Sequence, residues 1–222
     1  MTQDVICIHG LWMPGHEMTL LRRRLRHVHG YRTHQFSYSS VTRGLDAAVE
    51  RLREFVDATI EARTDDGVGS ESERKVHLVA HSLGGVLSLH MLQRFPDTPV
   101  ARVVCLGSPL VDSQPARKFL RYDAGKILVG RMLVEGIIEQ PLGAWAGPQQ
   151  VGVVAGTQPF GSARFIMKLD EPNDGVVSAA ETHLPGITAC VEMPVTHAGL
   201  LLSRRVTNQV AHFLRDGQFA TG

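Results

Sequence analysis

Short apolar, β-branched runs recur along the chain, separated by longer amphipathic stretches, and constrain its fold more than any other feature. Helical patterns fill the gaps between the runs, and a weaker helical pattern lies inside 113–140. Strands that alternate with helices form parallel sheets, because each crossover needs room for a helix. We therefore predict an α/β fold with about six mostly parallel strands and helices on both faces. The predicted strands lie near 4–9, 33–38, 75–80, 101–107, 151–156 and 187–194, and the clearer helices near 16–28, 45–62, 83–95 and 198–215.

The size and charge of the chain narrow its class. Its 222 residues, 43% of them hydrophobic, are enough for one buried core, so we expect a single domain over 1–222. The 23 basic and 22 acidic side chains leave a formal net charge of +1. Such a balance creates no strong overall field toward nucleic acid or an anionic membrane. We predict a neutral or weakly charged small-molecule substrate and no nucleic-acid partner.

Cysteine usage and the absence of export signals indicate a location. Cys7, Cys105 and Cys190 each lie in an apolar run, and an odd number of cysteines gives no disulfide framework. The first residues lack the basic region of a signal peptide. No apolar run approaches the ~20 residues that span a bilayer. We expect a cytoplasmic protein with no integral membrane segment.

The strongest local motif is the passage from strand to helix at Ala80-His81-Ser82-Leu83-Gly84-Gly85. A nucleophile elbow needs small residues two before and two after the serine, because strand and helix meet closely there. Ala80 and Gly84 fill these positions, with alanine where glycine is usual. A strand that ends in a polar turn would explain the same residues. In its context, we interpret Ser82 as a nucleophile.

Two backbone N–H groups are predicted to stabilise an oxyanion. The N–H of Leu83, at the start of the helix, faces the position where negative charge would develop. The second donor is expected from the loop after the first strand, His9-Gly10-Leu11-Trp12, and we assign it to the N–H of Leu11. Trp12 is predicted to line the substrate pocket, although a partly buried aromatic fits this position equally well.

A serine nucleophile needs a histidine base, and that histidine needs a carboxylate. The chain order that accompanies nucleophile elbows places the base after Ser82, which leaves four histidines. His90 and His212 fall inside predicted helices. His197 directly follows a predicted strand, at the sheet edge where ligands bind, and is the predicted base. His183 is the reserve candidate.

The predicted acid is Asp174, in the turn Pro172-Asn173-Asp174-Gly175. Asp170 and Glu171 are its nearest rivals. Alone, Asn-Asp-Gly is typical of an ordinary surface turn. Its place between Ser82 and His197 favours Asp174 as the group that orients the histidine.

Together these four motifs resemble the α/β-hydrolase superfamily, particularly its small bacterial lipases and esterases. The resemblance extends from residue 5 to the last helix, and some small lipases share alanine at the first elbow position. It implies cleavage of a carboxylic ester through an acyl-enzyme on Ser82, with no metal or organic cofactor. Because the strand before the oxyanion loop is the first in the chain, the resemblance implies a minimal version of the fold.

The substrate and the accessory segments stay open at this point. An acyltransferase or thioesterase would use the same triad, and a non-catalytic binding module would keep only the fold. Residues 111–147 interrupt the strands with many apolar side chains, which predicts either a cap or lid over the site or an ordinary crossover helix with a docking loop. Residues 64–75 predict a mobile surface loop. The oligomeric state is not predicted.

Overall fold

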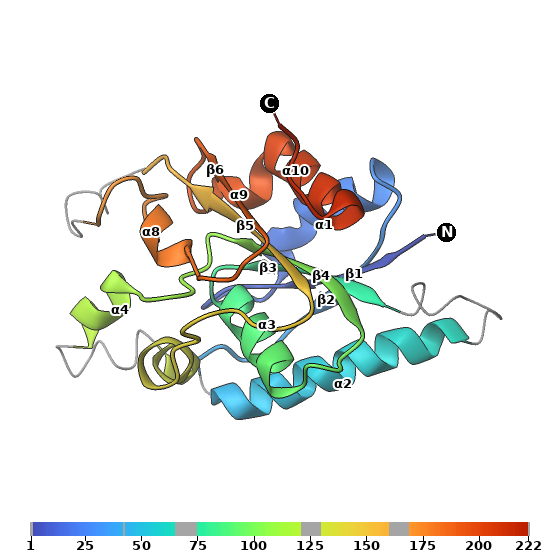
Figure 1. The fold of residues 1–222 in the computed structure, drawn as a ribbon, viewed down its shortest axis with the longest axis horizontal. Coiled ribbons are helices and arrows are strands. Elements are labelled where there is room, and N and C mark those ends of the chain that lie inside the picture. Colours follow the sequence, from blue (N-terminus) through green and yellow to red (C-terminus); the bar gives the residue numbers. More distant parts are fainter. Residues whose placement is uncertain (1, 42, 65–74, 121–129, 160–168, 222) are drawn as a thin grey trace.

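A six-stranded parallel sheet forms the centre of the molecule (Figure 1). The computed structural model describes residues 2–41, 43–64, 75–120, 130–159 and 169–221. Each neighbouring pair of strands is parallel, in the order β2-β1-β3-β4-β5-β6. This confirms the predicted α/β fold. The strands are β1 (Asp4–Ile8), β2 (Arg32–Phe36), β3 (Val76–His81), β4 (Val100–Leu106), β5 (Gln150–Gly156) and β6 (Ala189–Met193).

Helices cover both faces of this sheet. On one face lie α1 (Thr19–His27), α9 (Gly199–Leu202) and α10 (Arg204–Asp216), and on the other α2 (Leu45–Thr64) and α3 (Leu83–Arg94) (Figure 1). The strand residues alternate between the two helix layers. In β1, Val5 and Cys7 pack under the first layer, and Ile6 and Ile8 under the second. Strands buried on both faces, such as β1 and β3, read as nearly continuous apolar runs, which is why the sequence revealed them.

The helix predicted near 198–215 is two helices, α9 and α10. The break falls at Ser203, whose Oγ accepts a hydrogen bond from the N–H of Val206 at 3.4 Å. Serine favours such N-cap positions because its side chain satisfies an N–H that the first turn leaves free. In the same layer, the 3-10 turn η1 (His16–Met18) precedes α1. None of the described helices is long and apolar enough to cross a membrane.

Residues 111–147 contribute several short helices. They are α4 (Gln114–Phe119), α6 (Arg131–Leu133) and the π-helical η3 (Val134–Glu139). Met132, Ile137 and Trp145 are buried in the same core cluster as α2 and α3. The buried apolar side chains of residues 130–147 therefore pack as core. Residues 121–129, and residues 65–74 of the predicted surface loop, lie outside the described residues. A lid remains a prediction.

Strand order determines where a site can form. The chain runs outward from β1 to β2 and then returns to β3 on the other side of β1. The loops after β1 and β3 therefore diverge to opposite faces, and a crevice opens at the carboxyl ends of these strands. We call that edge the C-terminal edge and the opposite one the N-terminal edge. Ile8 pairs with Ala80, so the loop at His9 adjoins the turn at Ser82.

Candidate active site

Ser82 occupies a strained turn between β3 and α3. Its φ of 53° and ψ of −124° lie in a region that L-residues rarely adopt. The N–H of Ser82 donates to the carbonyl of Leu106 at the end of β4, 2.8 Å away. Strain of this kind persists only where the surroundings hold it, and it concentrates at functional sites. A sharp strand-to-helix turn is the geometry that a nucleophile elbow needs, and the role of Ser82 as a nucleophile stays a prediction.

Small residues around Ser82 allow the close approach of strand and helix. A β-carbon on Gly84 would lie 2.6 Å from the carbonyl oxygen of His9 and 2.7 Å from that of Ile8. No larger residue fits there without moving β1. The alanine at position 80 is accommodated because its methyl group is buried in the core cluster of α2 and α3. Alanine in place of the usual glycine therefore leaves the turn intact.

His197 and Asp174 form a buried acid–imidazole pair. Nδ1 of His197 lies 2.7 Å from Oδ2 of Asp174, whose residue is only 2% exposed. Oδ1 of Asp174 accepts the N–H groups of Val176 and Val177 at 2.9 and 2.8 Å. A carboxylate oxygen accepts hydrogen bonds and does not donate them. Nδ1 therefore carries the proton, and Nε2 of His197 is left with a free lone pair.

His81 and Gly107 bring this pair beside the serine turn. The rings of His81 and His197 are 4.5 Å apart, and Nε2 of His81 hydrogen-bonds the His197 carbonyl at 3.2 Å. A β-carbon on Gly107, where φ is +54°, would lie 2.9 Å from Asp174 Oδ2 and 3.1 Å from His197 Nδ1. Within the described structure Ser82 Oγ makes no hydrogen bond to His197. Catalytic hydrogen bonds are often long before substrate binds.

Burial keeps His81 neutral, since it holds the pKa of this imidazole well below its usual value. A positive charge on His197, as forms when it accepts a proton, would lower the pKa of His81 further. The neutral ring can thus donate from Nε2 to the His197 carbonyl without repelling a protonated His197. His81 supports the base without adding charge.

The orientation of the Gly10–Leu11 peptide follows from the tautomer of His9. Nε2 of His9 accepts the N–H of Tyr38 at 3.2 Å, so Nδ1 carries the proton and donates to the Gly10 carbonyl at 2.8 Å. Burial lowers the pKa of His9, which keeps the ring neutral. In a trans peptide the N–H points opposite to the carbonyl. The N–H of Leu11 therefore points away from His9.

Gly10 adjoins Ser82 directly. A β-carbon on Gly10 would lie 2.9 Å from Cβ of Ser82. The Leu11 amide follows at once in the chain, and the N–H of Leu83, the first residue of α3, has no acceptor within its own helix. Both predicted oxyanion donors thus flank the serine turn.

The remaining candidates lie in other environments. The side chain of Trp12 is 54% exposed beside the Leu11 amide, so it is not a core aromatic. The reserve base His183 hydrogen-bonds the Ala179 carbonyl of its own helix, α8 (Ala179–Thr182), through Nδ1 at 2.7 Å. The rival acid Asp170 accepts from Gln114 Nε2, and Glu171 is exposed.

Two residues of this site were absent from the sequence prediction. Gly107 follows β4 directly at the C-terminal edge, and a glycine in such a position is a signal that a backbone or ligand approaches closely. His81 precedes the predicted nucleophile, but its contact with His197 joins residues 116 positions apart. Nothing local to the sequence indicates that contact. Among the described residues, no group of three or more His, Cys, Asp or Glu side chains is arranged to hold a metal ion.

Comparisons with known proteins agree with this architecture. The profile of a family described as "Alpha/beta hydrolase family" matches residues 5–208. A search of curated proteins gives no match. Among solved structures, the mature lipase BlEst2 of Bacillus licheniformis is 17% identical with a TM-score of 0.75, and the alignment covers 96% of this chain and 91% of the lipase.

Two further structures extend the comparison. The metagenomic carboxyl esterase MGS0156 is 18% identical with a TM-score of 0.63, over 88% of this chain and 64% of the esterase. Phospholipase PlaB from Legionella pneumophila is 14% identical with a TM-score of 0.63, over 97% of this chain and 57% of that protein. At such low identities the likeness concerns the fold.

Proposed function

The chain belongs to the alpha/beta hydrolase family, and we propose that it is a serine hydrolase that cleaves carboxylic esters through an acyl-enzyme on Ser82. The observation that carries the proposal is the 2.7 Å hydrogen bond between His197 and the buried Asp174, held beside the strained serine turn. Acid, base and nucleophile occur in the chain order of this class. All three come from the C-terminal edge of the sheet.

In the proposed first step, Ser82 Oγ attacks the ester carbonyl carbon. Its proton passes to Nε2 of His197, which the hydrogen bond at Nδ1 leaves as the acceptor. Asp174 stabilises the imidazolium that forms. Its other oxygen accepts two backbone N–H groups, which hold the carboxylate in place.

The carbonyl oxygen becomes an oxyanion in this step, and the N–H groups of Leu11 and Leu83 would bind it. A single donor of this kind is typically worth about 10²–10³ in kcat. The bond from His9 to the Gly10 carbonyl supports this role, since it sets the direction of the Leu11 N–H. His197 then donates its proton to the leaving alcohol, and a water molecule, activated by His197, releases the acid from Ser82.

The substrate is an ester of low charge with an acyl chain of short to medium length, and Trp12 would line its pocket. The near-neutral chain supports an uncharged substrate. The fold is shared with a lipase and a carboxyl esterase, which act on the same bond class by their names. Phospholipase PlaB extends this likeness to a lipid hydrolase.

The test is hydrolysis of p-nitrophenyl esters from acetyl to palmitoyl by matched variants. We expect Ser82→Ala and His197→Gln to lose roughly 10⁴-fold or more in kcat. Ser37→Ala and His183→Gln serve as controls, because Ser37 is an exposed serine and His183 bonds only its own helix in the described structure. Both controls should retain wild-type activity. Loss of activity in His183→Gln but not in His197→Gln would reject the assignment of the base.

A fluorophosphonate probe separates the remaining alternatives. Labelling at Ser82, located by peptide mass spectrometry, is expected and would establish an activated serine. Labelling without ester hydrolysis, combined with acyl transfer to an added alcohol or thiol, would indicate an acyltransferase or thioesterase instead. An unlabelled, folded protein would reject a serine mechanism and favour a binding module.

A further inference from the structure

The two helix layers differ sharply in charge, although the whole chain is nearly neutral. The layer of α2 and α3 carries five acidic and four basic residues. The layer of α1, α9 and α10 carries one acidic residue, Asp216, and seven arginines. From the low net charge we predicted no attraction to anionic surfaces. That low value hides one helix layer with nearly balanced charge and another with a large excess of arginine. The seven arginines are Arg22, Arg23, Arg24, Arg26, Arg204, Arg205 and Arg215.

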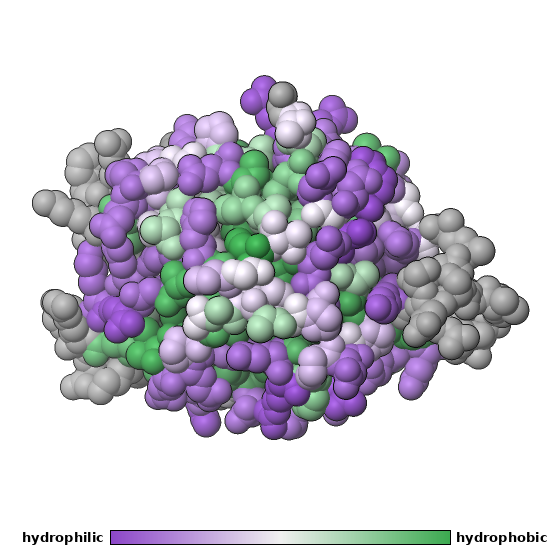
Figure 2. All heavy atoms as spheres, in the orientation of Figure 1, coloured by the Kyte–Doolittle hydropathy of each residue, from purple (hydrophilic) through white to green (hydrophobic). Residues whose placement is uncertain are grey.

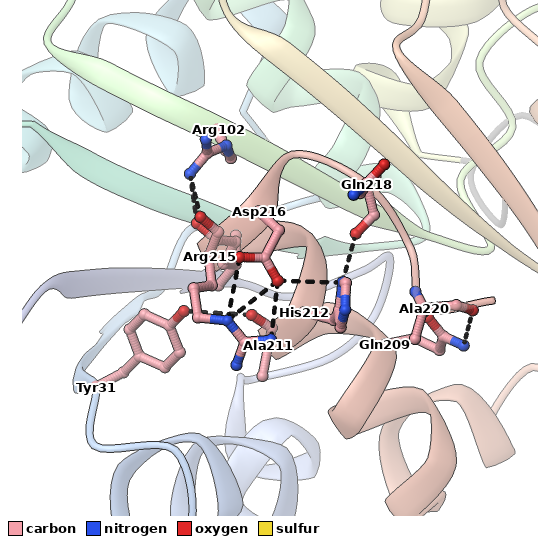
Figure 3. A network of polar contacts seen from close by, with 10 residues as sticks. Tyr31, Arg102, Gln209, Ala211, His212, Arg215, Asp216, Gln218 and Ala220 are labelled. Atoms are coloured by element: carbon pink, nitrogen blue, oxygen red, sulfur yellow. Dashed lines mark hydrogen bonds and ion pairs between the residues drawn. The ribbon is translucent and has the colours of Figure 1, made fainter. Parts of the chain in front are cut away.

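The arginines of α10 fall into two groups. At its far end, Arg215 bonds Asp216, and the nearby Arg102 of β4 donates to the carbonyls of Leu214 and Arg215 (Figure 3). At its first turn, Arg204 and Arg205 are exposed and make no ion pair with any residue that the structure describes. Cations at a helix N-terminus oppose the helix dipole. Their position therefore weakens α10 slightly. This favours a role for Arg204 and Arg205 in binding rather than in stability.

Exposed apolar side chains gather at the same end of this layer. Of the six large hydrophobic residues exposed in the described structure, five lie at the C-terminal edge. Leu202, 56% exposed, ends α9, and Leu20 lies in the first turn of α1. Arg24 ties the two helices together by donating to the Leu202 carbonyl at 2.6 Å. The other three are Trp12, Met13 and Val176.

Five exposed residues of α1, α9 and the first turn of α10, three helices that contact one another, make up what we call the arginine–leucine face: Leu20, Arg23, Leu202, Arg204 and Arg205. α1 and α10 pack side by side on one side of the sheet (Figure 1). Figure 2 shows hydrophobic residues at the surface next to hydrophilic ones over α9 and α10. Because α1 and α9 both begin at the C-terminal edge, the face borders the proposed active site.

We propose that the arginine–leucine face docks onto an anionic phospholipid bilayer. The arginines would pair with lipid phosphates and carboxylates, and the leucines would enter the interface between headgroups and acyl chains. Trp12 and Met13, at the mouth of the site, would then meet the same lipid surface. That the docked protein draws ester substrates from the bilayer rests on the proposed function. The docking itself does not.

The apolar residues favour a bilayer over a nucleic acid. A phosphate backbone would satisfy the arginines but leave Leu20 and Leu202 in water. A bilayer interface accepts both kinds of side chain, because its charged headgroups lie directly above an apolar layer. Each arginine near an anionic surface adds to the attraction, which salt screens over about 10 Å at 0.1 M ionic strength.

The test is co-sedimentation of the full chain with vesicles at low salt. One set is phosphatidylcholine alone, and the other contains about one third phosphatidylserine, which supplies the negative surface potential. We expect binding to the anionic vesicles only, and a loss of about tenfold or more in Arg23→Glu/Arg205→Glu. Arg51→Glu/Arg53→Glu, on α2 of the opposite face, is the matched charge control and should bind as the wild type does.

A second pair of variants tests the apolar contribution. Leu202→Ser should weaken vesicle binding several-fold, while Val28→Ser should not, because Val28 is equally exposed but lies at the opposite end of α1. Equal binding to both kinds of vesicle, no binding to anionic vesicles, or displacement of the protein from them by duplex DNA would overturn the proposal. Circular dichroism melting verifies that each variant folds.

The docking proposal and the proposed hydrolase function can be tested independently of each other. Ser82→Ala should sediment with anionic vesicles as the wild type does, because the serine is not part of the face. Hydrolysis of a soluble p-nitrophenyl ester should be unchanged in Arg23→Glu/Arg205→Glu. Esterase activity without vesicle binding would overturn only the docking, and vesicle binding without any hydrolase activity would overturn only the proposed function.

Discussion

Two acid–imidazole pairs of nearly the same geometry lie at opposite edges of the sheet. At the C-terminal edge, His197 Nδ1 is 2.7 Å from the Asp174 carboxylate, and at the start of β1, His34 Nε2 is 2.6 Å from the Asp4 carboxylate. Both carboxylates are almost completely buried. Distance and burial therefore do not separate a catalytic pair from a structural one.

The surroundings separate them. Asp4 also faces Arg32 at 3.7 Å, so its charge is shared with a permanent cation. Asp174 instead accepts backbone N–H groups and lies beside Gly107, which follows Leu106, the acceptor of the Ser82 N–H. Among the described residues, the two non-glycine residues with positive φ, Trp12 and Ser82, both lie at the C-terminal edge. Position at the carboxyl ends of the strands, together with local strain, distinguishes the candidate site.

The strongest test of this contrast is the removal of one carboxylate charge at each edge. Asp174→Asn should lower kcat for ester hydrolysis by about 10⁴-fold, because the amide no longer selects the His197 tautomer that accepts the serine proton. Asp4→Asn should leave kcat within about twofold, and its effect should fall on stability instead, since it breaks the pair with His34. Steady-state kinetics on a soluble ester and thermal melting of both variants measure the difference. Equal kinetic losses would refute the contrast.

Removal of a buried histidine at each edge sharpens the same contrast at a smaller scale. His9→Phe keeps the ring that stacks on Tyr38 at 4.3 Å but loses the donor to the Gly10 carbonyl. We expect kcat to fall by roughly 10–100-fold with little change in KM, because the Leu11 N–H is no longer held toward the oxyanion. His77→Phe, at the N-terminal edge, is the control. A His9→Phe variant with unchanged kcat would exclude Leu11 as an oxyanion donor.

The parts of this protein that the sequence predicted are those that local patterns determine. Strands buried on both faces give continuous apolar runs, and the elbow around Ser82 requires small residues at fixed spacing. Chain order places Asp170, Glu171 and Asp174 alike between Ser82 and His197, so only the tight turn favoured Asp174. The 2.7 Å bond that joins it to His197 depends on packing between loops 23 residues apart.

The parts that escaped prediction depend on long-range contacts. The ring contact between His81 and His197, and the space at Gly107 next to Asp174, arise only when β3, β4 and β6 lie in one sheet. The division of the last helix at Ser203 escaped prediction for a different reason. An N-cap serine is a local signal, but the helical spacing of apolar residues continues across it and concealed the break. The charge difference between the two helix layers was likewise hidden by the net charge.

A methyl group added at each edge tests the tight packing around the pair of Asp174 and His197. Gly107→Ala would place a β-carbon against Asp174 and His197, whereas Gly30→Ala, with φ also positive at +75°, meets no atom within 4 Å. Both should lose about 1 kcal/mol of stability from backbone strain, and Gly107→Ala should lose more because its β-carbon would also lie 2.6 Å from Leu200 Cδ1. Only Gly107→Ala should also lose activity, by roughly tenfold, because a small displacement of His197 disturbs proton transfer. Activity equal to that of Gly30→Ala would show that the pair tolerates displacement.

The smallest expected effect concerns pH and belongs to the N-terminal edge. Burial lowers the pKa of His77 to about 4 from 6.5, with a lesser contribution from the charge of Arg102. Between these two pKa values the unfolded chain binds a proton that the folded chain does not, so stability falls as pH drops below 6.5.

From about pH 7 to about pH 5.5 this single group should lower the free energy of unfolding by about 1 kcal/mol. His77→Gln removes the titration while it keeps a polar side chain near Gln3, the 3.2 Å partner of His77 Nε2. Urea unfolding at both pH values should therefore show a smaller acid loss in the variant than in the wild type. His9, His81 and His90, whose pKa values burial also lowers, should leave the variant with a residual loss of the same sign.

An identical acid loss in both proteins would mean that His77 is protonated in the folded state. A change in ester hydrolysis at pH 7 would mean that the N-terminal edge influences the site at the other edge, against the separation drawn from the two acid–imidazole pairs.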